Sequence, residues 1–176
     1  MKYAGRGSIR IAPPDSMRFD FAGPLNLGSG AAVIIGDSVA WADPEKNFRS
    51  LIPAVPMLWA AFAMVRPPAE DATVFGEDAG AADSVTHRRR VIWRFAQGED
   101  TLDYVVTDSA GRESLLEAEW RRRGKMLAQS RSRLDSLQHP ASARIDFPEG
   151  PARFELTVGV VDTAAVIPPN TWRSRH

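Results

Sequence analysis

The feature that most constrains the fold of this chain is an alternation of apolar and charged side chains with a period of two. Near the N-terminus, Met17, Phe19 and Phe21 alternate with Arg18 and Asp20. Because successive side chains of a β-strand point to opposite faces, this pattern predicts a strand with one apolar and one polar face. The same period predicts strands at residues 39–41, 91–95, 102–106, 116–120, 126–134, 145–147 and 154–160, and a continuous apolar run predicts one at residues 31–35.

Short turn signals separate most of these segments. Gly36-Asp37, residues 97–100, Gly124-Lys125 and residues 148–151 each carry glycine, proline or small polar residues between two alternating runs. Connections of this length join antiparallel neighbours, since parallel pairing needs a long crossover. We therefore expect roughly nine to eleven antiparallel strands of ordinary length.

The distribution of side chains predicts how such a wide sheet is arranged. A twisted sheet of this width must curl or split. Most aromatic residues fall on one face and most charged residues on the other. This favours a single strongly curved sheet, an unclosed half-barrel wrapped around its own apolar concavity, over a two-sheet sandwich. At 176 residues, the chain is expected to form one domain, residues 1–176.

One segment departs from the β pattern. Residues 55–65 lack alternation, are rich in Ala and Met, and begin beside Pro56, a residue favoured in the first turn of a helix. The i, i+3, i+4 spacing of its large residues predicts a short helix that is apolar around nearly its whole circumference. Such a helix requires burial, and we expect it to cover the concave face. Residues 66–84, rich in small and acidic side chains, are expected to form a mobile loop.

The large apolar residues of the inner face and the helix form the candidate ligand-binding set. They are Met17, Phe19, Phe21, Trp41, Leu58, Trp59, Phe62, Trp93, Phe95, Tyr104, Trp120, Phe147 and Phe154. Each one taken singly is compatible with a dry core. Together they exceed what one curved sheet and one short helix need, which suggests a site for acyl chains. Each buried methylene contributes about 0.8 kcal/mol, so such a site gains affinity from chain length alone.

Several classes of function find no support in the sequence. The 22 basic and 22 acidic residues balance, and no nucleic-acid partner is expected. There is no cysteine, and His87, His139 and His176 have no second ligand at metal-binding spacing. No nucleotide-binding or nucleophile motif occurs. We therefore expect no metal, no cofactor, no catalytic residue and no enzyme activity. The arginine runs at 88–90 and 121–123 are interpreted as solvated strand ends, or as contacts for an acidic partner or anionic head groups.

Three stretches resemble the bacterial lipoprotein-localisation family of LolA-like periplasmic carriers and LolB-like outer-membrane acceptors. The first is Pro13–Pro24, a predicted strand flanked by prolines. The second is Gly36–Pro44, a turn followed by a strand that contains a Trp and ends at a proline, before the apolar helix. The third is the closing hairpin Ala143–Val161, followed by Ile167-Pro168-Pro169. The resemblance implies an unclosed barrel with helical lids that shelters the acyl chains of a lipoprotein. It also implies a location in the periplasm or at the periplasmic face of the outer membrane, with the signal segment outside this chain.

Two departures from the family pattern concern the lid and the anchor. Ala12 stands where a carrier's lid-locking arginine is expected, and the lipidated cysteine of an acceptor is missing. The resemblance thus implies a relative with its own cargo.

Three functions remain open at this point. The first is an envelope protein that binds lipid or lipoprotein acyl chains, with other envelope proteins and a peripheral membrane surface as further partners. The alternative is a non-catalytic structural or interaction protein of the cell envelope that uses the same fold with a closed core. The third is an enzyme that uses the pocket, because a fold does not fix a function.

Overall fold

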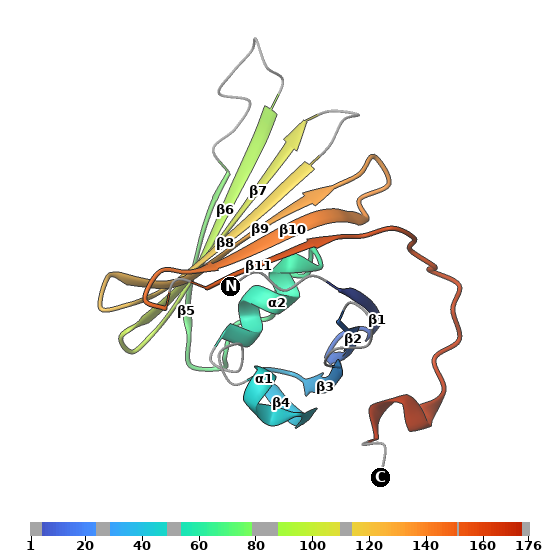
Figure 1. Cartoon of the computed structure of the whole chain (residues 1–176). Coiled ribbons are helices and arrows are strands. Elements are labelled where there is room, and N and C mark those ends of the chain that lie inside the picture. Colours follow the sequence, from blue (N-terminus) through green and yellow to red (C-terminus); the bar gives the residue numbers. More distant parts are fainter. Residues whose placement is uncertain are drawn as a thin grey trace. The chain divides into compact units, whose positions relative to one another are not determined.

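A computed structural model of the chain describes residues 5–23, 29–48, 54–78, 88–109, 114–150 and 152–173. Strands make up 59% of these residues, and every ladder is antiparallel, so the mainly β class expected from the alternation is confirmed. The described residues contain eleven strands in two sheets, one of four strands and one of seven (Figure 1). Two compact units hold these sheets, the first comprising Met1–Val55 with Asp162–His176 and the second Pro56–Val161.

The first unit contains a four-stranded meander in which each strand pairs with the next along the chain. Its strands are β1 (Arg6–Ala12), β2 (Ser16–Ala22), β3 (Ser29–Ile35) and β4 (Ser38–Asp43). Helix α1 (Glu45–Phe48) follows β4, and the 3₁₀ turn η3 (Pro169–Trp172) belongs to the same unit. The alternation near the N-terminus therefore predicted β2 correctly.

The second unit contains the seven-stranded sheet, again with neighbours in the chain paired in space. Its strands are β5 (Thr73–Asp78), β6 (Arg88–Gln97), β7 (Asp100–Ser109), β8 (Ser114–Arg122), β9 (Lys125–Leu134), β10 (Pro140–Phe147) and β11 (Ala152–Thr157). Helix α2 (Val55–Ala61) packs against a sheet. The Ser132 hydroxyl of β9 donates a hydrogen bond to the Ala61 carbonyl, 3.1 Å away, which ties the end of α2 to the seven-stranded sheet.

The expectation of one strongly curved sheet is wrong. The strands divide into two sheets, and neither is strongly curled. The break falls between β4 and β5, where the described residues 44–48 and 54–72 lie outside the ladders and contain both α1 and α2. Pro44, Pro56, Pro67 and Pro68 lie in this segment, and a proline has no amide hydrogen to donate to a ladder. Alternation predicts strands, but it does not reveal which strands fail to pair.

Two element boundaries also differ from the sequence expectations. The helix expected over residues 55–65 ends at Ala61. The loop expected over residues 66–84 contains strand β5, whose six residues are all exposed, and residues 79–84 lie outside the described part. An edge strand that is exposed on both faces has no apolar alternation, so the pattern that revealed the other strands was absent.

Helix α2 ends early because the chain adopts a left-handed conformation at Ala63, whose φ is 62°. The amide of Met64 bonds the carbonyl of Trp59, and the amide of Ala63 bonds that of Ala60, both at 3.0 Å. This is the Schellman pattern, in which the left-handed position is usually glycine. An alanine at this position carries a steric cost of about 1–2 kcal/mol.

Replacing Ala63 with glycine should therefore stabilise the protein. The relief of backbone strain exceeds the added entropy of the unfolded chain, so we expect a net gain of about 0.5–1 kcal/mol in the free energy of unfolding. Urea denaturation measures it. Ala60→Gly, inside the helix, is the control and should lower stability by about 1 kcal/mol. A loss of stability in Ala63→Gly would show that the alanine methyl group packs usefully.

Candidate functional site

Within the second unit, the strand register brings six of the predicted site residues onto one face of the seven-stranded sheet. The pairs Trp93↔Tyr104, Tyr104↔Ala118 and Phe95↔Leu102 run across it, and directly paired residues share a face. The six residues are Trp93, Phe95, Tyr104, Trp120, Phe147 and Phe154. The ring centres of Phe95 and Tyr104 lie 5.6 Å apart.

Helix α2 supplies the next three predicted residues. Trp59 is fully buried, Phe62 just beyond the helix is buried, and Leu58 is half-buried. The guanidinium of Arg66 lies 5.2 Å from the centre of the Trp59 ring, in cation–π geometry. The hydrogen bond from Ser132 to Ala61 places the end of this helix against the apolar face of the sheet.

That apolar face is buried in its middle and exposed towards one edge. Tyr104, Ala118 and Ile145 have between 0% and 1% of their surface exposed. At the β5–β6 edge, Val74 is 45% and Trp93 42% exposed. Thus a continuous apolar surface runs from a dry core to a solvent-accessible edge within one sheet.

Two serines of β9 interrupt the apolar face, and both are buried. Ser132 bonds α2, whereas the hydroxyl of Ser130 has no hydrogen-bond partner among the described residues. Sequence reasoning missed them, although the signal was present. Arg131 and Arg133 lie in the predicted strand 126–134, and their charges belong on the polar face of the sheet. Because neighbouring side chains alternate, Ser130 and Ser132 must then lie on the apolar face.

The four remaining predicted residues belong to the four-stranded sheet. Met17, Phe19 and Phe21 share one of its faces, and the rings of Phe19 and Phe21 stack with their centres 6.5 Å apart. Trp41 was expected on the same face and is not there. Its backbone pairs with Val33, which pairs with Arg18, so Trp41 lies on the Arg18 face. A bulge in β4 inserts one extra residue between Val39 and Trp41, and such a shift turns the following side chain to the opposite face.

Trp41 and Arg18 together hold the C-terminal turn η3. Arg18 is 3% exposed and donates two hydrogen bonds to Asp20 through Nε, at 3.1 and 2.9 Å, and one through Nη2, at 2.8 Å. Its Nη1 donates to the carbonyls of Thr171 and Arg173, at 2.7 and 3.3 Å. The guanidinium lies 5.2 Å from the Trp41 ring centre, and Trp41 Nε1 donates to the carbonyl of Trp172 at 3.4 Å. The hydrogen bonds to Asp20 raise the pKa of Arg18 despite its burial, so the guanidinium stays charged.

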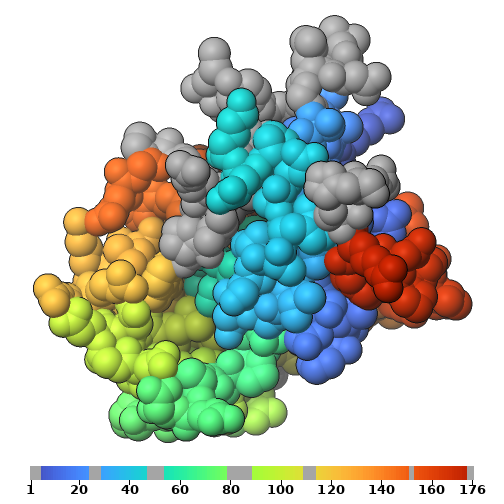
Figure 2. Space-filling model, turned by 90° about the horizontal axis from the view of Figure 1, so that it is seen from below, coloured from blue at the N-terminus to red at the C-terminus, as the bar shows by residue number. Residues whose placement is uncertain are grey.

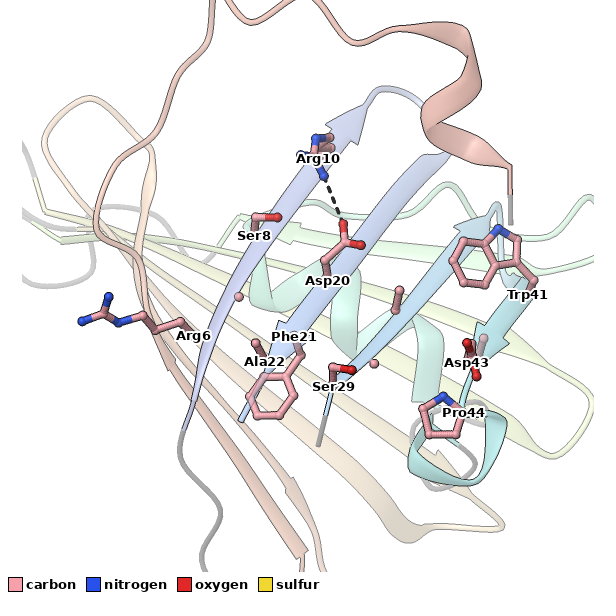
Figure 3. Close-up of a pocket in the computed structure, with 14 residues that line it drawn as sticks. Arg6, Ser8, Arg10, Asp20, Phe21, Ala22, Ser29, Trp41, Asp43 and Pro44 are labelled. Atoms are coloured by element: carbon pink, nitrogen blue, oxygen red, sulfur yellow. Dashed lines mark hydrogen bonds and ion pairs between the residues drawn. The ribbon is translucent and has the colours of Figure 1, made fainter. Parts of the chain in front are cut away.

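A hollow of about 670 Å³ lies over the same unit. Figure 3 shows Arg10 reaching Asp20 across β1 and β2, with Trp41, Asp43 and Pro44 on the far side and Arg6 pointing outward. Small side chains form much of its floor, among them Ser8, Ser29 and Ala31. The hollow is open and is lined by polar and apolar side chains in similar measure, so it suits acyl chains less well than an apolar groove would.

The outer face of the seven-stranded sheet carries ion pairs across neighbouring strands. Arg94 donates two hydrogen bonds of 2.7 Å to Asp103, and Arg131 donates to Glu117. Asp146 accepts hydrogen bonds from Arg144 and Arg153, at 2.6 and 2.7 Å. Burial alone would raise the pKa of Asp146, but the two arginines outweigh it and hold that pKa below its ordinary value.

The arginine run at 121–123 is likewise paired with acids. Arg121 bonds Glu119, Arg122 bonds Asp100, and Arg123 bonds Glu99. The bond with Arg122 is the main cause that lowers the pKa of Asp100. Within the run at 88–90, Arg89 bonds Asp78. These pairs compensate the charges of Arg89 and of all three arginines in the run at 121–123.

Among the described residues, no group of three His, Asp or Glu side chains could hold a metal ion. His139 lies 3.9 Å from Asp135, within a loop whose amides also bond that carboxylate. His87 and His176 lie outside the described residues. No helix in the described ranges is long and apolar enough to cross a membrane.

Comparisons with protein-family models, with curated proteins and with solved structures gave no match for this chain.

Replacing Arg18 with lysine should release η3. A lysine ammonium keeps the charge but cannot bond Asp20 and two carbonyls at once as the planar guanidinium does. We expect hydrogen–deuterium exchange at the amides of Thr171 and Arg173 to accelerate about tenfold or more, the loss of roughly one strong hydrogen bond. Arg10→Lys is the control, since Arg10 bonds the same Asp20 but not η3. Unchanged protection in Arg18→Lys would show that other contacts hold the turn.

Asp146→Asn should destabilise the protein near neutral pH and have no effect in acid. The folded-state pKa of Asp146 is depressed, so its contribution is present above the unfolded pKa of about 3.9 and disappears as the pH falls through the lower folded value. We expect a loss of about 1 kcal/mol at pH 7. Urea unfolding at pH 7 and at pH 2 measures the difference. Glu155→Gln, whose carboxylate is 3.8 Å from Arg153 and well exposed, should show little effect at either pH.

Proposed function

We propose that this protein binds the acyl chains of a lipid or lipoprotein in the cell envelope, against the apolar face of the seven-stranded sheet. The observation that carries the proposal is the incomplete cover of that face. α2 packs over the buried part, while Val74 and Trp93 leave the same face accessible at the edge. A ligand that enters from the edge beside Val74 and Trp93 meets the apolar and aromatic side chains of Phe95 and Tyr104 on the same face.

Helix α2 is the element that must yield for a long chain to enter. It has seven residues, and isolated helices of that length are not stable in water, so its structure depends on its packing. The hydrogen bond from Ser132 is a polar tie at its C-terminal end. A short apolar helix held mainly by non-directional contacts can shift and exchange its own side chains for acyl methylenes, each contributing about 0.8 kcal/mol.

The buried Ser130 and Ser132 place two hydroxyl groups on the apolar face of the seven-stranded sheet. Ser130 carries a buried hydroxyl with no hydrogen-bond partner among the described residues, which costs about 1–3 kcal/mol if nothing satisfies it. An ester or carboxyl oxygen of a bound lipid is a suitable acceptor. This supports a lipid with a polar linkage over a plain hydrocarbon.

A second candidate is a non-catalytic structural or interaction protein of the cell envelope. The specific observation in its favour is the Arg18 face of the four-stranded sheet. There, Arg18 and Trp41 donate to three successive backbone carbonyls, those of Thr171, Trp172 and Arg173. A surface that already binds a peptide backbone, with an open hollow beside it, suits a protein partner. The two functions use different units of the chain and are separable by experiment.

Phe62→Ala tests whether α2 and the residue after it form a cover or a fixed core. For a cover, we expect a stability loss smaller than the roughly 3–5 kcal/mol typical of a Phe-to-Ala change in a rigid core. A fluorescent fatty acid should then bind at least as tightly as to the unmodified protein, because the deletion creates space. Fluorescence titration and urea unfolding give both quantities.

Ile145→Ala is the matched control for this experiment. Ile145 is fully buried on the same face of the sheet, away from α2 in sequence, and its truncation should cost about 2–5 kcal/mol without improving binding. If Phe62→Ala instead unfolds the protein and abolishes binding, the segment belongs to the core and the lid hypothesis fails.

A further inference from the structure

The edge of the seven-stranded sheet presents apolar side chains on both of its faces. Val74 of β5 and Trp93 of β6 lie on the face that α2 contacts, and Phe75 lies on the opposite face. Their exposed fractions are 45%, 42% and 56%, high for residues of this kind. These three residues are called the edge patch below. In Figure 2, β5 and the segment before it, in green, lie at the surface.

The position of Trp93 depends on a glycine in the edge strand. Gly76 pairs with Trp93, and a Cβ at residue 76 would approach ring atom Cζ3 of Trp93 to 2.6 Å. Any larger residue would push the indole away. The ring therefore lies against the backbone of β5, where it is held in place and remains exposed. A large aromatic ring fixed at a sheet edge is well placed to meet a surface.

Two arginines next to the edge patch are paired with aspartates. Arg94, which pairs with Phe75 in the register, bonds Asp103 through two nitrogens, and Arg89 bonds Asp78 at 2.6 Å. These hydrogen bonds raise the pKa of both arginines, which stay charged at physiological pH. Because these arginines are already paired and Glu77 of β5 adds an exposed negative charge, the edge gains little from an anionic surface, and a zwitterionic surface suits it better.

We propose that the edge patch docks on the zwitterionic surface of a lipid bilayer. Tryptophan is favoured at the level of the head groups, where one side of the ring is apolar and the other is hydrated. The patch is continuous with the apolar face through Trp93, so docking there brings acyl chains to the start of the proposed binding surface. The inference rests on the proposed function and adds the source from which the ligand is drawn.

Sedimentation of the full chain with phosphatidylcholine vesicles tests the docking. We expect binding that is nearly independent of salt, since its origin is apolar burial and not charge. Phe75→Ser should lower the partition coefficient about tenfold, the effect expected from exposing most of one large side chain. Leu137→Ser, a change of an even more exposed apolar residue in the β9–β10 turn, is the control and should bind like the unmodified protein.

The outcomes separate docking from acyl-chain binding. Phe75 lies on the face away from α2, so Phe75→Ser should keep its affinity for a fluorescent fatty acid while it loses vesicle binding. If Phe75→Ser and Leu137→Ser weaken vesicle binding equally, or neither does, the edge patch is not the docking surface. If vesicle binding depends on Phe75 but no variant binds the fatty acid, docking stands and the proposed function fails.

A spectroscopic measurement places the indole independently. Vesicles that carry bromine on the first acyl carbons beyond the head group should quench part of the tryptophan fluorescence of the full chain. Trp93→Phe should remove that part of the quenching while the chain still sediments with the vesicles. Quenching that is unchanged in Trp93→Phe would contradict docking through this edge.

Discussion

The packing of α2 against the seven-stranded sheet is the interaction on which the account depends. The sheet has one apolar face that must leave water, and α2 has too few residues to exist as a helix without a surface to pack on. Each therefore needs the other. Trp59, Ala60 and Ala61 are fully buried, so the apolar side of the helix is removed from water. The exposed Trp93 shows that the apolar face of the sheet continues beyond the buried region. The helix is held largely by apolar burial together with the hydrogen bond from Ser132, and we propose that acyl chains replace part of this apolar contact.

The polar faces of the two sheets fix geometry more than they add stability. On the seven-stranded sheet, carboxylates such as Asp146 sit between arginines of neighbouring strands, and exposed pairs of this kind contribute about 1 kcal/mol or less each. Their value lies in register, because a slip by one residue would move the charged side chains to the buried face. Arg18 acts differently. It is buried, with five hydrogen bonds of its own, and it joins β2 to a turn more than 150 residues later in the chain.

Much of the secondary structure could be predicted, because alternation is a local property. The runs around Phe19, Trp93 and Trp120 all lie within observed strands. What the alternation could not supply was pairing at a distance. It did not show that β4 and β5 belong to separate sheets, and it missed β5 because an edge strand exposed on both faces carries no pattern. Trp41 was placed on the wrong face because one bulged residue reverses the parity of the strand. The helix was extended too far because nothing marks Ala63 as a residue with positive φ.

We propose that the apolar face of the seven-stranded sheet binds acyl chains. Identifying the lipid that co-purifies with the protein tests this proposal most directly. Mass spectrometry of an organic extract of the full chain, purified without detergent, identifies whatever lipid travels with it. The account predicts acyl lipid in near-stoichiometric amount, depleted in a variant that fills the face, such as Ala118→Phe. A lipid-free extract from folded protein, together with no uptake of added phospholipid, would contradict it and leave the face as a closed core.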